Sequence, residues 1–181
     1  CVRGTDIPMF KSGALTNAPI RYILNKNLKN KEVRENNIII EISGGSPVQS
    51  TGRAVLVSAS HIQTMETPII CSNFCRAIQL TSNTYSRLFY SHIDYLYDLD
   101  YLFTFENSTT GVKNFDLNAF LEEEYMVKPN NSLLVEYNNT FDLLQKNILS
   151  HRREINGLKK LKEMMLAKMS RVESFRTEQV L

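Results

Sequence analysis

The sequence lacks the motifs by which common enzyme classes bind nucleotides or activate a nucleophile. It contains no Gly-x-Gly-x-x-Gly loop, no P-loop, no His-Glu-x-x-His pair and no Gly-x-Ser-x-Gly elbow. It also lacks any run of about eighteen apolar residues, so we expect no membrane-spanning helix. These absences favour a non-catalytic protein that needs no cofactor.

Cysteine and histidine are scarce and scattered. Only Cys71 and Cys75 lie close together among three cysteines, and His61, His92 and His151 are far apart along the chain. A disulfide framework or a zinc site needs a larger and more regularly spaced set. We therefore expect no metal site and buried free thiols, as in a cytoplasmic protein.

The formal net charge of +2 conceals an uneven distribution of charged residues. Residues 1–53 contain eight Lys and Arg against four acids, whereas residues 94–124 contain eight acids and Lys113 as the single base. Residues 146–171 contain eight bases against two acids. This distribution would draw a polyanion to the first third and to the C-terminal segment. The alternative is that these are solvated faces without a partner.

The last third of the chain is its most regular part. Apolar residues recur there at alternating spacings of three and four, which predicts one long helix from Asn131 to about Val172. A mean spacing of about 3.5 residues is typical of helices that supercoil against a partner. We therefore expect residues 131–181 to act as a dimerisation helix and spacer; the alternative is a helix folded back over its own domain. The predicted seam consists of Leu134, Tyr137, Phe141, Leu144, Ile148, His151, Ile155, Leu158, Met165, Met169 and Val172.

Residues 1–130 are predicted to form a mixed α+β domain, with strands first and helices later. Because the chain begins in a strand-like pattern, we expect this domain to lack its N-terminal start. The predicted strands are Val2–Ile7, Ile20–Leu24, Ile38–Ile42, Arg53–Val57, one or two within Ile69–Leu80, and Tyr125–Lys128. The predicted helical segments are Asn27–Val33, Asn83 to about Tyr97, Leu99–Phe105 and a short helix capped by Asp116, with a hinge at Pro129–Asn131.

Two loops rich in small hydrogen-bonding residues are candidate binding sites. The first spans Ser43–Arg53, and the second spans residues 108–114. Gln can contact an adenine edge through two hydrogen bonds, and Arg suits guanine or phosphate. Taken alone, such loops are also common as tight turns. The predicted DNA contacts are Ser43, Gly44, Gly45, Ser46, Gln49, Ser50, Thr51, Arg53, Thr110, Lys113 and Asn114.

Several segments together resemble one protein family. They are Arg3–Pro8, Ser43–Arg53, Ser72–Arg76, Thr110–Leu117 and the long terminal helix. In this order the chain resembles the specificity subunit of type I restriction-modification enzymes over nearly its whole length. The start of the long helix departs from the family pattern, because Pro129-Asn130 stands where the family has Pro-Pro and a following Glu-Gln is missing.

The resemblance implies a target-recognition domain in residues 1–130 that reads a few base pairs of double-stranded DNA. Complete subunits carry the domain and helix twice and pair the two helices antiparallel as a spacer. One copy therefore implies half a subunit, which a homodimer would complete around a two-fold axis. Partner subunits would supply the methyltransferase and endonuclease activities. The alternative is a coiled-coil dimer whose heads bind protein rather than DNA.

Overall fold

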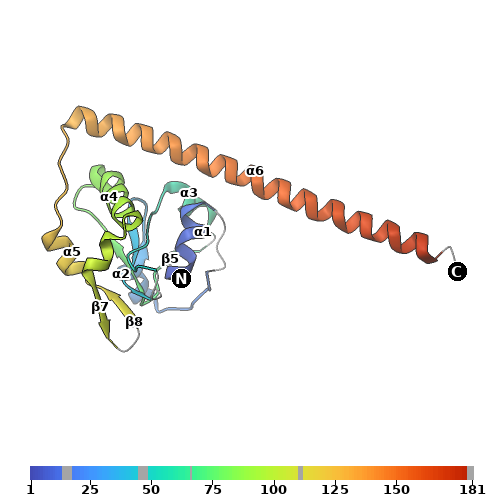
Figure 1. Ribbon diagram of the computed structural model, residues 1–181, viewed down its shortest axis with the longest axis horizontal. Helices are drawn as coiled ribbons and strands as arrows, with labels where there is room; N and C mark the ends of the chain where they lie inside the picture. The colour runs from blue at the N-terminus through green and yellow to red at the C-terminus, as the bar shows by residue number, and fades with distance from the viewer. Residues whose placement is uncertain (14–17, 45–48, 66, 110–111, 179–181) are drawn as a thin grey trace.

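The computed structural model of this protein describes residues 1–13, 18–44, 49–65, 67–109 and 112–178. It is a mixed α/β head from which one long helix, α6 (Asn131–Glu178), extends (Figure 1). At about 1.5 Å per residue, the 48 residues of α6 span roughly 70 Å. Within the described ranges, no helix combines the length and the apolar content that crossing a bilayer requires.

The head contains five short helices and three antiparallel sheets in its described residues. The helices are α1 (Ile7–Lys11), α2 (Asn25–Lys31), α3 (Ala59–Thr64), α4 (Ser86–Asp98) and α5 (Leu117–Glu123), with 3-10 turns η1 (Gly4–Asp6), η2 (Asn83–Tyr85) and η3 (Tyr101–Phe105). The strands are β1 (Glu32–Val33), β2 (Ile38–Glu41), β3 (Ser43–Gly44), β4 (Ala54–Leu56), β5 (Ile69–Ile70), β6 (Cys75–Ile78), β7 (Glu106–Thr109) and β8 (Val112–Phe115). The sheet orders are β4-β2-β6, β3-β8-β7 and β1-β5.

Strand β2 separates two hydrophobic cores. Ile38 and Ile40 face a cluster formed with α4, η3 and α5, whereas Ile39 faces a cluster formed with α1, β1 and β5. All three isoleucines are fully buried. Successive side chains of a strand point to opposite faces. A strand that is covered on both faces therefore needs the uninterrupted apolar sequence that β2 has.

At Ile42 the chain passes from the central sheet, β4-β2-β6, to the second sheet, β3-β8-β7. The Ile42 N–H donates to the Phe74 carbonyl at 2.9 Å, and the Ile42 carbonyl accepts from the Phe115 N–H at 2.9 Å. Directly afterwards, β3 pairs with β8, with Ser43 opposite Asn114. The β7–β8 hairpin is thereby held at the end of β2 (Figure 1).

Most predicted elements of the head are confirmed, including the central strand, the strands within Ile69–Leu80 and the helices α2, α4 and α5. Two predicted boundaries have a clear physical cause. The Asp116 carboxylate accepts from the Ala119 N–H at 3.0 Å, and the Asn130 side-chain oxygen accepts from the Leu133 N–H at 2.8 Å. Each side chain satisfies a backbone donor that a helix leaves free at its start.

Three predicted strands are wrong. Val2–Ile7 forms only an isolated bridge at Val2 before η1 and α1, because Pro8 suits the first turn of a helix. Neither Ile20–Leu24 nor Tyr125–Lys128 forms a strand. Their apolar and aromatic residues imitate a strand, but no described sheet edge pairs with them, and Tyr22 and Tyr125 remain exposed. Conversely, the loop expected around Ser108 is part of the β7–β8 hairpin.

The first turns of α6 pack on the head of the same chain. Leu134 is 2% exposed, and the Tyr137 hydroxyl donates to Ser91 Oγ at 2.6 Å. Phe141 makes an edge-to-face contact with Tyr90, at 6.0 Å between ring centroids. The prediction that Leu134, Tyr137 and Phe141 face a partner helix is therefore corrected: these residues face their own head.

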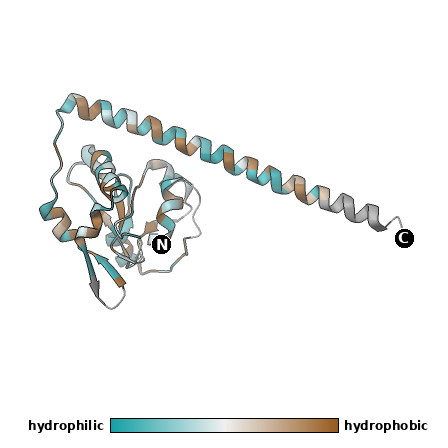
Figure 2. Ribbon diagram, in the orientation of Figure 1, coloured by the Kyte–Doolittle hydropathy of each residue, from teal (hydrophilic) through white to brown (hydrophobic). Residues whose placement is uncertain are grey.

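Beyond Phe141, the docked face of α6 and the predicted seam separate. The docked face continues through the half-buried Gln145, Leu149 and Arg152, and the Arg152 guanidinium donates to the Ser12 carbonyl at 3.3 Å. A straight helix has about 3.6 residues per turn, so a seam with a period of about 3.5 rotates by about 20° per heptad. The exposed seam residues are Leu144, Ile148, His151, Ile155, Leu158, Met165 and Met169, within the apolar patches that recur along α6 (Figure 2). Val172 belongs to the part of α6 whose side chains are not described.

His61 joins α1 to α3 inside the second core. Its Nδ1 accepts from the Ser58 N–H at 3.0 Å, so Nε2 carries the proton and donates to the Phe10 carbonyl at 2.9 Å. The imidazole also stacks on the Phe10 ring, at 4.3 Å between centroids. Burial lowers the pKa of His61, and the hydrogen bond to Phe10 opposes this effect only in part.

We expect the free energy of unfolding to decrease as the pH falls below about 6.5, the ordinary pKa of histidine. The unfolded chain takes up a proton there that folded His61 resists, so the folded state loses stability as the pH falls. Urea unfolding at pH 8 and pH 5.5 measures the change. His61→Gln should weaken this pH dependence, whereas His151→Gln on the exposed face of α6 should leave it unchanged. An undiminished pH dependence in His61→Gln would refute this explanation.

Candidate nucleic-acid interface

The described parts of the two loops predicted as binding sites lie next to each other. Ser43 and Asn114 lie opposite each other in the β3–β8 pair, and the Ser43 hydroxyl donates to the Asn114 side-chain oxygen at 2.8 Å. The Lys113 ammonium donates to the Gln49 carbonyl at 3.4 Å. Residues that are 64 and 71 positions apart along the chain are thus in contact. Gly45, Ser46 and Thr110, which were also predicted as contacts, lie outside the described residues.

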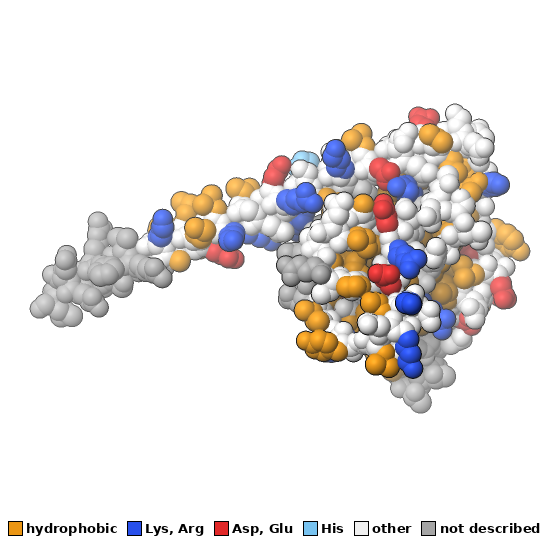
Figure 3. Space-filling view, turned by 180° about the vertical axis from the view of Figure 1, so that it is seen from behind, with side chains coloured by type: hydrophobic (Ala, Val, Ile, Leu, Met, Phe, Trp, Pro, Cys, Tyr) orange, Lys and Arg blue, Asp and Glu red, His pale blue; other side chains and the backbone are white. Residues whose placement is uncertain are grey.

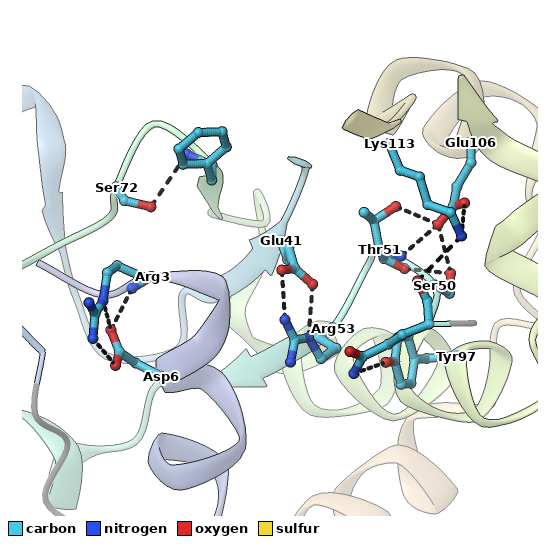
Figure 4. A network of polar contacts seen from close by, with 12 residues as sticks. Arg3, Asp6, Glu41, Ser50, Thr51, Arg53, Ser72, Tyr97, Glu106 and Lys113 are labelled. Carbon is cyan, nitrogen blue, oxygen red and sulfur yellow. Dashed lines mark hydrogen bonds and ion pairs between the residues drawn. The ribbon is translucent and has the colours of Figure 1, made fainter. Parts of the chain in front are cut away.

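Glu106 anchors the first loop to strand β7. Its Oε1 accepts hydrogen bonds from the Thr51 N–H at 2.6 Å, the Thr51 hydroxyl at 2.8 Å and the Ser50 hydroxyl at 3.2 Å (Figure 4). Its other carboxylate oxygen lies 3.2 Å from the Lys113 ammonium. Burial raises the pKa of Glu106, but the hydrogen bonds from Thr51 and Lys113 outweigh burial and lower it overall. Glu106 is therefore an ionised anchor.

Three predicted contact residues belong to this anchor. Ser50 and Thr51 are buried, and the Lys113 side chain is 17% exposed. The Lys113 ammonium also lies 4.3 Å from the centroid of the Phe103 ring. The structure therefore places Ser50, Thr51 and Lys113 in the support of the loop and leaves Gln49 exposed at its edge. The Gln49 amide reaches the Tyr97 hydroxyl at 3.4 Å.

Arg53 forms a buried ion pair with Glu41 at the end of β2. Two parallel hydrogen bonds of 2.8 and 2.7 Å join the guanidinium to the carboxylate (Figure 4). The Arg53 side chain is 15% exposed and that of Glu41 is 4% exposed. The prediction that Arg53 contacts DNA is therefore corrected. Its side chain points toward the interior, where it neutralises the buried Glu41 carboxylate.

Glycines allow the backbone to approach this carboxylate. A Cβ at Gly4 would overlap the Glu41 side chain. At Gly44 a Cβ would lie 3.1 Å from Glu41 Oε1, and the φ of +135° there already disfavours other residues. Gly4 of the N-terminal segment therefore meets Gly44 and Arg53 of the first loop at one carboxylate.

An open hollow of about 240 Å³ lies between β6, the β7–β8 hairpin and α5. Arg76, Asn107, Asn114 and Asn118 are exposed at it, and Arg76 makes no ion pair within the described part of the chain. Sequence reasoning identified only Asn114. Arg76 lies in the Ser72–Arg76 segment that supports the family resemblance, but the pattern did not show which way its side chain points. The hollow is lined by Ile42, Arg76, Asn107, Asn114, Phe115, Asp116, Leu117 and Asn118.

The exposed side chains at the hollow are hydrogen-bonding groups. Amide side chains donate and accept hydrogen bonds, and a guanidinium donates in a planar fork. Burial raises the pKa of Cys71 to about 12 and that of Cys75 to about 11, so both thiols stay protonated near neutral pH. Across the described residues, no three His, Cys, Asp or Glu side chains gather as a metal site.

No known protein family matches the chain, and no curated protein matches it significantly.

We expect Arg53→Ala to lower the free energy of unfolding by about 3 kcal/mol, because it leaves the buried Glu41 carboxylate unpaired. Removing both charges, as in Arg53→Met with Glu41→Gln, should be less destabilising than Arg53→Ala alone. Arg34→Ala is the control, because it breaks an exposed pair with Glu32 at 3.5 Å and should cost less than about 1 kcal/mol. Denaturant titration measures all the variants. Equal costs for Arg53→Ala and Arg34→Ala would refute the buried-pair argument.

Proposed function

We propose that the head recognises double-stranded DNA, as the target-recognition part of a type I restriction-modification specificity subunit. The main support is the β3–β8 pairing, which gathers hydrogen-bonding side chains from four segments at one exposed hollow. The segments are β6 with Arg76, β7 with Asn107, β8 with Asn114 and α5 with Asn118. The protein itself catalyses nothing in this proposal.

In this mechanism the exposed side chains at the hollow contact base edges. Arg76 would donate two hydrogen bonds to a guanine, and Asn114 or Asn118 would contact an adenine in the same manner. Each such pair is worth about 1–3 kcal/mol of discrimination against a wrong base. The contacts of Glu41 and Glu106 hold Ser50, Thr51 and Arg53 in place beside the hollow, and a preorganised support reduces the entropy lost on binding.

Helix α6 acts in the proposal as spacer and dimerisation element. Its docked turns fix the direction in which the rod leaves the head, and the exposed seam beyond Leu144 is free for a second copy. Antiparallel pairing around a two-fold axis would place two heads at opposite ends of the paired helices. Methyltransferase subunits would bind this dimer, and the system would be cytoplasmic.

We expect Arg76→Ala with Asn114→Ala to abolish most of the preference for a selected DNA target over a scrambled duplex. The loss of two base contacts predicts a discrimination lower by roughly 2–6 kcal/mol. Gel shifts with duplexes selected from a random pool measure the preference. The control is Asn73→Ala, which removes an exposed amide outside the hollow. A double variant that keeps full discrimination would exclude the hollow as the reading site.

We expect the chain to be a dimer at micromolar concentration and Leu158→Lys to shift it to a monomer, because the lysine places a charge in the apolar seam. Light scattering after gel filtration measures the mass. Ala167→Lys introduces the same charge on the opposite side of the helix and should leave the dimer intact. A wild-type monomer would contradict the spacer role of α6.

A head that binds protein is the second candidate. It is favoured by the apolar side chains of Ile20, Tyr22 and Leu24, which are 72%, 100% and 62% exposed. Salt dependence separates the two functions, because contacts with DNA phosphates release counterions and weaken steeply with salt. An apolar contact does not weaken in this way.

A further inference from the structure

Helix α2 has an unusual composition for a structural element. Its seven residues are three Asn, three Lys and one Leu, with no acid. Leu28 is half-buried and lines an apolar hollow against the head, whereas the other six residues are exposed. The helix is thus attached by one side chain and presents only amides and ammonium groups to solvent.

The helical repeat places Lys26 and Asn30 on the side opposite Leu28, with Lys29 next to them. Within the described residues, Lys26, Lys29 and Lys31 make no ion pair. Other basic residues of the first third are neutralised: the pairs are Arg3–Asp6, Lys11–Asp94, Arg34–Glu32 and Arg53–Glu41. The positive charge of residues 1–53 that stays free is therefore concentrated on α2 and the neighbouring Arg21.

Helix stability does not account for this composition. Lysines in the last turn, such as Lys29 and Lys31, interact favourably with the helix dipole. Lys26 lies in the first turn, where the dipole disfavours a positive charge, and asparagine is a poor helix former. Residues that weaken their own element are expected where a function requires them.

The position of α2 indicates which anion it meets. In Figure 1, α2 lies toward the same end of the head as the β7–β8 hairpin, away from α6. Figure 3 shows Lys and Arg side chains following one another down the lower half of the head. A duplex that lay across the hairpin would therefore extend toward this end of the head, where ammonium and amide groups can contact its phosphates.

We propose that α2 is a phosphate-contacting helix, in which Lys26, Lys29 and Asn30 bind the backbone of the DNA duplex that the hollow reads. This inference rests on the proposed DNA-recognition function. The contacts of α2 carry no sequence information, and they set affinity and orientation. Two lysine–phosphate contacts contribute about 1.8 to the slope of log affinity against log salt.

Fluorescence anisotropy with the full chain tests this. A labelled 30-base-pair duplex of the selected target and one of scrambled sequence are titrated between 50 and 200 mM KCl. For Lys26→Gln with Lys29→Gln, we expect affinity to fall by roughly tenfold for both duplexes and the salt slope to decrease by about two. The preference for the selected duplex should be retained.

Two matched variants complete the experiment. Lys26→Arg with Lys29→Arg keeps the charges and should keep affinity and slope. Lys159→Gln with Lys160→Gln removes the same charge from the part of α6 beyond the head. In this proposal the duplex lies at the end of the head that faces away from α6, so the slope should keep its wild-type value although the segment is basic.

The possible failures are distinguishable. An unchanged salt slope in the Lys26/Lys29 variant, with wild-type discrimination intact, overturns the role of α2 and leaves the proposed function standing. If the wild-type chain binds neither duplex, both proposals fail. Binding to phosphatidylserine vesicles that depends on Lys26 and Lys29, without DNA binding, would assign α2 to a membrane surface instead.

Discussion

A buried carboxylate at the end of the central strand organises the head. Glu41 ends β2 where the chain crosses to the second sheet, and it is held by Arg53 through two hydrogen bonds. A charge in the interior must be paired, and Arg53 supplies the opposite charge. The backbone at Gly4 and Gly44 also comes close to the Glu41 side chain, where a Cβ would crowd it. This requirement joins the N-terminal segment, the first loop and the central sheet.

The second anchor, Glu106, explains why Ser50 and Thr51 are buried although both are polar. Ser50 and Thr51 turn inward because the Glu106 carboxylate needs donors, and Lys113 lies over it for the same reason. Because the Ser50 and Thr51 hydroxyls donate to Glu106, they are not available to a ligand at the surface. The accessible groups are at the neighbouring hollow, where the side chains of Arg76 and Asn118 are exposed.

Helix α6 combines two periodicities in one sequence. Near its start, the residues that satisfy the straight-helix repeat bury against α4. Leu149 lies directly on Gly13, where a Cβ would overlap the Leu149 side chain. Further along, the apolar residues keep a shorter repeat and rotate to the solvent side. One helix can thus belong to its own head and still leave a second apolar face free.

By itself, the sequence determined the elements whose signals are local. The isoleucine run predicts β2, the Asp116 cap predicts the start of α5, and the hinge at Pro129–Asn131 and the apolar spacing predict the long helix that follows it. Only the tertiary structure decided which strands exist among short apolar segments, because Ile20–Leu24 has the pattern but no sheet edge to pair with. It also decided which polar side chains are free. The type of a residue states which bonds it can make, but the partners of Arg53 and Thr51 are 12 and 55 positions away, and folding alone brings them together.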